Sequence, residues 1–284
     1  MGIVYMFLAS ACFATMSAFI KGIGQELPIP ELVFLRCLLA IPFLMFIVHL
    51  RQRPYIVKAK KLVILRTIFG MTAMFCFFYA LTHMPLAECI FLGRTQPLLL
   101  ALLSPFVIGE KAPLAAWLAI FTGICGVALI MQPQAAWSSV GWVAVAGAAA
   151  AAMAHLMVRR LNATDFPLTI VFNFTVLTCI ISGIWVFPRF VMPSISHWFF
   201  LLCVALFASL GQLFMTLAYQ RDRAPAIASA SYASVVLALF YGYFIWGEVP
   251  QTFTWIGGAL IVSGGILLLK SRLHVNEPPS PAAT

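Results

Sequence analysis

Two stretches of the sequence, residues 109–117 (GEKAPLAAW) and 247–255 (GEVPQTFTW), decide the expected fold because the second repeats the pattern of the first. Each begins with a Gly-Glu pair at the end of an apolar segment, and each has a tryptophan seven residues after the glutamate. We call the shift that carries Gly109 onto Gly247 the repeat offset. At this offset, residues 70–131 align with residues 208–269 without a gap and share eight identical positions. The repeat predicts a chain made of two similar halves.

The composition predicts a membrane protein. Hydrophobic residues make up 63% of the 284 and charged residues only 9%, whereas soluble domains have about 45–50% and about 25%. So few charges would not cover the surface of a soluble protein of this size. The apolar residues come in blocks of about 18–22, which is the length a helix needs to cross a hydrocarbon core of about 30 Å. We therefore expect an all-α polytopic membrane protein.

Apolar blocks separated by helix-breaking residues predict ten membrane spans. They cover residues 3–20, 32–50, 62–82, 86–108, 113–131, 138–158, 167–187, 196–219, 224–246 and 252–269. The first span lacks a basic leader and a cleavage motif, so we expect it to be retained. Residues 1–135 then form the first five-helix repeat, residues 136–270 form the second, and the proline-rich residues 271–284 form a disordered cytoplasmic tail.

Basic residues between the spans predict the orientation of the chain, because cytoplasmic loops carry an excess of Lys and Arg. With a cytoplasmic N-terminus, the outside connections hold only Lys21 and Arg189. The inside connections hold thirteen basic residues: Arg51, Arg53, Lys58, Lys60, Lys61, Arg66, Lys111, Arg159, Arg160, Arg221, Arg223, Lys270 and Arg272. We expect both termini to be cytoplasmic. The net charge of +9 then reflects orientation and attraction to anionic lipid, and not binding of nucleic acid.

An odd number of spans in each half forces the two halves to cross the membrane in opposite directions. Inverted repeats of this kind recur in secondary transporters, which bind substrate between the halves near the bilayer midplane. The sequence contains no G-x-x-x-x-G-K-[ST] phosphate loop, so we expect no ATP hydrolysis in this chain. It also lacks G-x-S-x-G and H-E-x-x-H motifs, which argues against an intramembrane enzyme. A channel filter is not indicated either.

Several segments resemble the EamA-type family of the drug/metabolite transporter superfamily. They are the stretch from Pro85-Leu86-Ala87-Glu88 to Pro97-Leu98, the two Gly-Glu pairs, the late-helix segments 124–127 and 263–266, and Phe34-Leu35-Arg36. The resemblance covers nearly the whole chain. It implies a ten-helix, twofold pseudosymmetric carrier that moves small polar or amphipathic metabolites by alternating access. The chain departs from the family pattern at Arg94, where a small or apolar residue is expected, and this departure suggests an anionic group on the substrate.

Arg94 is the leading candidate for substrate binding, because a charged side chain near mid-bilayer costs about 2.5–3.5 kcal/mol and should face the bundle interior. Its guanidinium can bind a carboxylate or phosphate through two parallel hydrogen bonds. A structural pairing with Glu88 is the alternative. Substrate binding predicts that Arg94→Ala abolishes transport and leaves folding intact.

Glu88 and His155 are candidates for proton coupling. Glu88 lies in the first turn of its span, where a carboxylate is also favoured by the helix dipole, so a structural role stays open. His155 can exchange a proton near neutral pH, although a buried histidine is often only hydrogen-bonded. Coupling through Glu88 would also suit the alternative function, proton-coupled efflux of cationic drugs. The positive charge of Arg94 opposes that alternative.

The remaining candidates are uncharged polar residues and helix-end residues. The expected cavity lining is Tyr79, Gln96, Asn173, Gln212, Ser231 and Tyr232, and the expected structural residues are Arg36, Gly109, Glu110, Gly247 and Glu248. The seven cysteines lie inside predicted spans without metal-ligand spacing. We therefore expect a transporter for a small polar metabolite (amino-acid-like, cofactor-like or organic-anion) in the bacterial inner membrane. We expect no cofactor or metal, contact with membrane lipid, no nucleic acid, and a homodimer as one option for its assembly.

Overall fold

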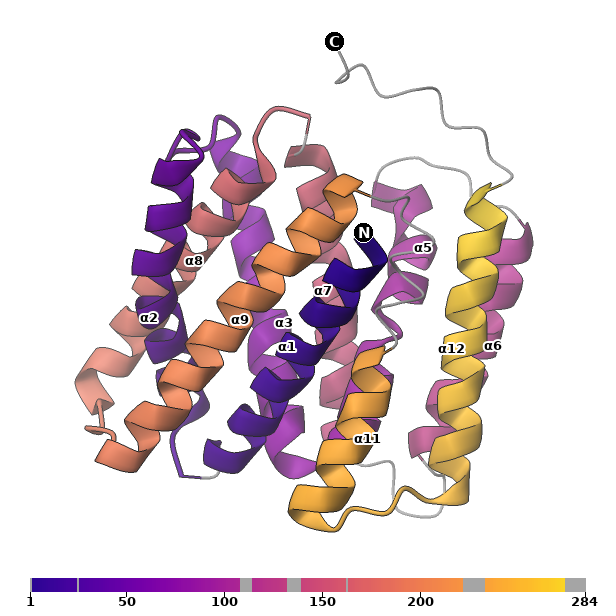
Figure 1. Cartoon of the computed structure of the whole chain (residues 1–284). Coiled ribbons are helices and arrows are strands. Elements are labelled where there is room, and N and C mark those ends of the chain that lie inside the picture. Colours follow the sequence, from indigo (N-terminus) through magenta and orange to yellow (C-terminus); the bar gives the residue numbers. More distant parts are fainter. Residues whose placement is uncertain are drawn as a thin grey trace.

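The computed structural model describes residues 2–24, 26–107, 114–131, 139–161, 163–221 and 233–273. The helices of this part of the chain run along a common direction and form a bundle (Figure 1). They are α1 (Gly2–Ile23), α2 (Ile29–Leu50), α3 (Lys60–His83), α4 (Leu86–Gly93), α5 (Gln96–Val107), α6 (Leu114–Met131), α7 (Ser139–Leu161), α8 (Pro167–Val186), the 3₁₀ turn η1 (Phe187–Arg189), α9 (Ile195–Arg221), α11 (Ala233–Trp246) and α12 (Thr252–Leu273).

The described helices confirm the expected all-α polytopic membrane protein. Seven apolar helical segments in the described ranges are long enough to cross a bilayer, and three shorter apolar ones lie within α6, α11 and α12. Large apolar side chains point outward from the bundle, such as Phe106 (79% exposed), Ile184 (72%) and Val236 (68%). Exposed apolar surface of this extent suits a lipid environment, because contact with hydrocarbon carries no hydrophobic penalty.

The predicted fourth span is present, but it is made of two helical pieces. The chain forms α4, breaks at Arg94 and Thr95, and continues as α5 from Gln96. Pro97 has no N–H to donate to the carbonyl of Gly93, and its ring would clash with that carbonyl in a continuous helix. The Thr95 hydroxyl instead donates to the carbonyl of Leu92 (2.6 Å) and satisfies part of the broken ladder. Discontinuous helices of this kind often surround binding sites in transporters.

Helix boundaries in the two parts of the chain follow the same spacing as the sequence repeat. The repeat offset carries the starts of α2 and α6, Ile29 and Leu114, onto the starts of α8 and α12. It also carries the end of α3, His83, onto the end of α9. The helix contacts obey the same offset: α3 contacts α7, and α9 contacts α1, while α2 contacts α8 and α6 contacts α12. Counterpart helices therefore meet in matching pairs across the bundle.

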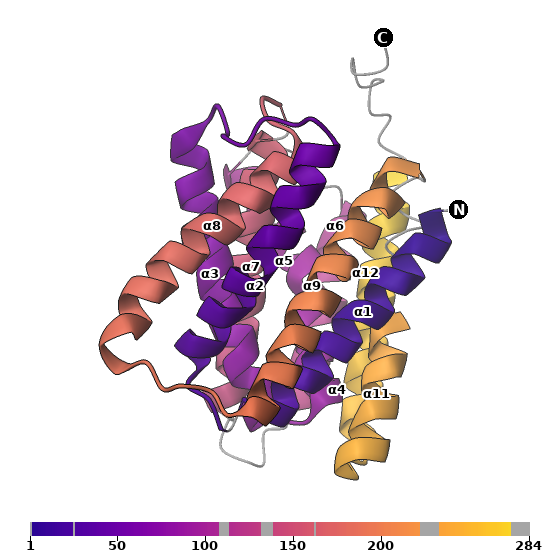
Figure 2. The ribbon, with the colours of Figure 1, turned by 60° about the vertical axis from the view of Figure 1, so that its left-hand side comes forward.

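The pair α6 and α12 lies at one edge of the bundle (Figures 1 and 2), and glycines bring the two helices together. A Cβ added to Gly126 would lie 2.5 Å from the carbonyl oxygen of Gly257, and a Cβ on Gly257 would lie 2.5 Å from that of Gly126. The repeat offset relates Gly126 to Gly264, where a Cβ would lie 2.7 Å from the carbonyl oxygen of Ala119. Small residues allow this close helix approach in membranes.

Candidate functional site

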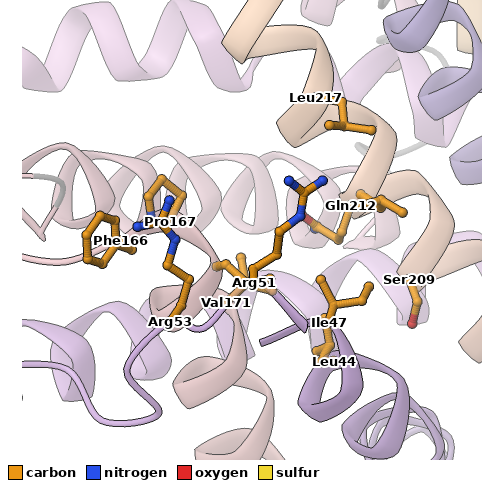
Figure 3. Close-up of a pocket in the computed structure, with 12 residues that line it drawn as sticks. Leu44, Ile47, Arg51, Arg53, Phe166, Pro167, Val171, Ser209, Gln212 and Leu217 are labelled. Atoms are coloured by element: carbon orange, nitrogen blue, oxygen red, sulfur yellow. The ribbon is translucent and has the colours of Figure 1, made fainter. Parts of the chain in front are cut away.

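A cavity of about 190 Å³, which we call the mouth cavity, opens between α2, α8 and α9 (Figure 3). It lies where α2 ends and α8 begins, at the end of the bundle that also carries Lys58, Lys60, Lys61 and Arg160; we call this the basic end. Its walls combine apolar side chains with a few polar ones: Leu44, Ile47, Arg51, Arg53, Phe166, Pro167, Leu168, Val171, Ser209, Gln212, Leu213 and Leu217.

Two arginines, Arg51 and Arg53, line the entrance of the mouth cavity. The Arg53 guanidinium lies over the Phe166 ring, 4.2 Å from its centroid, and Arg51 extends from the end of α2 toward Gln212 (Figure 3). Helix α8 begins beside them at Pro167, and its cap residue Phe166 supplies no side-chain hydrogen bond. The positive end of the α8 dipole therefore adds to the two arginine charges. The entrance favours anions.

A second cavity of about 40 Å³, the inner cavity, continues toward the middle of the bundle. It shares Leu44, Val171, Ser209 and Gln212 with the mouth cavity. Its further walls come from α2, α3, α8 and α9: Arg36, Cys37, Ala40, Arg66, Phe174, Thr175 and Ala208. The two cavities are adjacent, and together they extend from the basic end to Arg36 and Arg66.

The guanidinium groups of Arg36 and Arg66 each lie near the face of an aromatic ring. The Arg66 guanidinium lies 3.6 Å from the centroid of Phe174, and that of Arg36 lies 5.8 Å from the centroid of Phe78. Arg36 also contacts the sulfur of Met74. Arg36 Nε and Arg66 Nε and Nη1 are buried and make no hydrogen bond within the described part of the chain. No acidic residue is found among the described residues that line the two cavities, so the charge of these walls is positive.

At the opposite end of the bundle, Glu248 joins several segments of the chain. Its carboxylate pairs with the ammonium of Lys21 and accepts the backbone N–H of Leu86 (2.9 Å). The Lys21 ammonium also donates to the carbonyl of Met84 (2.8 Å). These contacts join α1, the start of α4 and the connection between α11 and α12. We call this cluster the Lys21–Glu248 tie.

Gly247 places Glu248 in the tie. Its φ of +65° is a left-handed conformation that glycine adopts without steric cost. The Gly247 N–H donates to the carbonyl of Tyr243 (3.0 Å), which ends α11. Two further contacts join a helix end to a loop at this end of the bundle: His197 of α9 with Glu26 (2.6 Å), and the Val191 N–H with the carboxylate of Glu31 on α2 (3.3 Å).

The charged candidates from the sequence do not pair with one another in the hydrogen bonds observed among the described residues. Arg94 lies at the break between α4 and α5 and donates to the hydroxyl of Ser234 on α11. Glu88 on α4 accepts a hydrogen bond from Thr254 on α12 (3.1 Å). Each contact joins the broken helix α4–α5 to the second part of the chain. The proposed substrate and proton-coupling roles of the two residues stay predictions.

The uncharged candidates occupy four different places. Gln96 and His155 hydrogen-bond to each other (2.6 Å) between α5 and α7. The Asn173 amide donates to the carbonyls of Tyr55 (2.7 Å) and Thr169 (2.8 Å), so it fastens the loop after α2. Tyr79 stacks on His83, with ring centroids 4.2 Å apart, and Gln212 is the one described candidate of this group that lines both cavities. Ser231, Tyr232, Gly109 and Glu110 lie outside the described residues.

Arg66 and Lys21 are important residues whose roles the sequence analysis missed. Arg66 counted there as a basic loop residue, although residue 66 already lies within the predicted span 62–82, and the structure places it on α3 against Phe174. Its position inside an apolar span was the available signal. Lys21 counted only as an outside charge, and no local pattern links it to Glu248, 227 residues away.

Comparison with known proteins places the chain in a family. The model of the EamA-like transporter family matches residues 1–132 and again residues 137–270. A pseudopaline exporter of Pseudomonas aeruginosa is 31% identical over 95% of this chain and 96% of its own length. A riboflavin transporter of Rhizobium johnstonii is 27% identical over 70% of this chain and 67% of its own length. Human solute carrier family 35 member G1 is 28% identical over 92% and 76%.

A solved crystal structure shares the fold, with a TM-score of 0.66 and 23% identity over 96% of this chain and 98% of the other. The family match and the transporters among the relatives indicate an integral membrane transporter and not an enzyme. The chain belongs to the EamA-like transporter family.

Proposed function

We propose that the protein is a secondary transporter that moves a small polar metabolite across the bacterial inner membrane by alternating access. One observation carries the proposal: the two cavities lie toward the basic end, while the Lys21–Glu248 tie joins α1, the start of α4 and the connection after α11 at the opposite end, which we take as the closed one. A carrier that exposes its site to one side at a time needs one open and one closed end. With the basic end in the cytoplasm, as the excess of Lys and Arg predicts, this conformation faces inward and both termini are cytoplasmic.

Alternating access in this proposal depends on two inverted repeats, residues 1–135 and 136–270. The matching helix contacts under the repeat offset support this division, as does the double match of the family model. Rocking of the matched pairs would open the end closed by the tie and close the basic end. Glu88 and His155 are the proposed proton-coupling residues in this scheme, and Arg94 is proposed to contact the substrate near the helix break.

The substrate class follows from the cavity walls and from the relatives. The relatives are named for exporting pseudopaline and for transporting riboflavin, which supports a metabolite as cargo. The alternative, proton-coupled efflux of cationic drugs through Glu88, conflicts with the four arginines that line the two cavities, Arg36, Arg51, Arg53 and Arg66. A cation would meet their combined repulsion in a poorly screened site.

Cysteine accessibility tests alternating access without a known substrate. In a variant that lacks the native cysteines, Ser209→Cys places a thiol on the shared wall of both cavities. We expect a small membrane-impermeant methanethiosulfonate to label it from the basic side only. Adding Glu248→Gln should make it accessible from the opposite side. Two control variants carry an exposed cysteine on one side each: Lys60→Cys should be labelled from the basic side, and Met192→Cys from the opposite side.

Labelling of Ser209→Cys from both sides in protein with an intact tie would indicate a channel and reject the proposal. If Ser209→Cys is still labelled from the basic side only in both the Glu248→Gln and the Lys21→Met variants, the proposal that breaking the tie opens the opposite end is rejected.

A further inference from the structure

The inner cavity contains two cationic side chains without an anionic partner among the described residues of its wall. Arg36 from α2 and Arg66 from α3 line the same small cavity, and no acidic side chain of the described chain lines either cavity. A buried charge in a membrane protein is costly and is normally paired. Arg36 Nε and Arg66 Nε and Nη1 also lack hydrogen-bond acceptors within the described ranges. The arrangement fits an anion that supplies both the charge and the acceptors.

The aromatic contacts favour recognition of a planar anion. Phe174 lies against the guanidinium of Arg66, and Phe78 lies near that of Arg36. A ring on the face of a guanidinium leaves the N–H groups at its edge free to donate, and this edge matches the two oxygens of a carboxylate. Lysine would not provide the same planar fork. The Ser209 and Gln212 side chains on the shared wall add neutral hydrogen-bonding groups.

The walls of the mouth cavity indicate the polarity of the rest of the ligand. Beyond Arg51 and Arg53 its walls are mainly apolar, from Ile47, Leu213 and Leu217 among others. The inner cavity, at about 40 Å³, holds a small group but not a whole metabolite. The ligand would therefore place an anionic head between Arg36 and Arg66 and a less polar body in the mouth cavity.

We propose that Arg36 and Arg66 form the binding site for a carboxylate of the transported molecule, with Arg51 and Arg53 guiding it in from the basic end. The inference rests on the proposed function and names its substrate class, a small organic molecule that carries at least one carboxylate. It assigns Arg36 to binding, whereas the sequence suggested an anchor between helices.

Isothermal titration of the full chain in phosphatidylcholine nanodiscs tests the assignment. The probes are succinate and phenylacetate, with succinamide and phenylacetamide as uncharged matches. We expect at least one carboxylate to bind more than tenfold tighter than its amide. Arg36→Gln and Arg66→Gln should each weaken that binding at least tenfold. Lys61→Gln, which removes an exposed charge at the same end outside both cavities, should change it less than twofold.

If a glutamine variant does not fold, the corresponding lysine variant is tested in its place. Arg36→Lys and Arg66→Lys retain the charge but lose the fork, so the same carboxylate should bind several-fold more weakly. Equal losses in Lys61→Gln and the arginine variants would show a general charge effect and overturn the site. So would the absence of any carboxylate that binds better than its amide. The Ser209→Cys accessibility result is independent of these probes, so failure here leaves the transport proposal standing.

Anionic lipid is the other source of a negatively charged head group. The titration is therefore repeated in nanodiscs that contain phosphatidylglycerol. Unchanged carboxylate affinity supports a soluble substrate. If phosphatidylglycerol displaces the carboxylate, and the Arg36→Gln and Arg66→Gln variants lose that competition, a lipid head group occupies the cavity and the metabolite assignment is overturned.

Discussion

The ammonium of Lys21 on α1 pairs with the carboxylate of Glu248, which follows α11, and both side chains are mostly buried, at 11% and 20% exposed. The other carboxylate oxygen of Glu248 accepts the Leu86 N–H at the start of α4. One acidic residue therefore satisfies both a lysine and one of the orphan donors of a helix N-terminus. Loss of this residue would remove its contacts with both α1 and the start of α4.

Glu248→Gln should lower the free energy of unfolding by roughly 1–3 kcal/mol, because it leaves a largely buried ammonium without its anionic partner. Thermal unfolding in detergent measures the change. Lys21→Met is the matched partner variant: it leaves the contact of Glu248 with Leu86 in place but removes both bonds of the ammonium, so it should also lower the stability. Equal stability of the wild type and Glu248→Gln would show that the tie contributes nothing measurable.

Gly70→Ala should disturb the Arg66 site without removing a charge. Gly70 lies one turn from Arg66, and a Cβ there would overlap the Arg66 guanidinium and lie 2.9 Å from the Phe174 ring. We expect carboxylate binding to weaken several-fold while thermal stability changes little, because the flexible arginine can move aside. The matched control is Gly93→Ala, whose Cβ would lie 3.6 Å from Phe77 at an ordinary contact distance. Weakened binding in both variants would argue against a specific effect on Arg66.

Gly126→Ala should force α6 and α12 apart. The added methyl would meet the carbonyl oxygen of Gly257 at 2.5 Å, and backbone cannot yield as a side chain can. We expect a loss of roughly 1–3 kcal/mol, the usual cost of overpacking, measured by thermal unfolding. Gly264→Ala should behave alike if the two helices are related by the repeat. A large difference between these two variants would count against that relation.

Asp165 should make stability depend on pH at the basic end. Its carboxylate accepts the N–H groups of Lys58 (2.6 Å) and Ala59 (3.3 Å) and the hydroxyl of Thr164 (2.8 Å). Slight burial alone would raise the pKa of this carboxyl, but these hydrogen bonds outweigh it and hold the pKa below its usual value. Since the folded pKa lies below the unfolded value of about 3.9, the stabilisation is present above that value and disappears as the pH falls through the folded pKa.

Asp165→Asn should therefore unfold at a lower temperature than the wild type at pH 7, and the gap in unfolding temperature should be smaller at about pH 3, below the unfolded pKa. Thermal unfolding at both pH values, with Asp165→Glu as a charge-preserving control, checks this. A gap that stays constant with pH would mean that the ionised form is not what stabilises the loop.

The local sequence predicted most of the helices, because a membrane span is recognised by the length and polarity of one segment. The ends of α2, α6 and α8 agree with the predicted spans to within three residues, since prolines such as Pro30 and Pro167 favour the first turn of a helix. The position of the break at Arg94 and Thr95 was not predicted, although Pro97 permits a bend in this span. Hydropathy averages over a span and is insensitive to one interrupted hydrogen bond.

The sequence by itself determined that the chain is an α-helical membrane protein of this family, because composition, span length and the internal repeat can be read along the chain without knowing how it folds. Only the tertiary structure decided which charges meet. Arg36 and Arg66 line one cavity from different helices, and Lys21 pairs with Glu248, which lies 227 residues away in the sequence. Such pairings depend on how helices pack against each other, and the packing is set by side chains far apart in the chain.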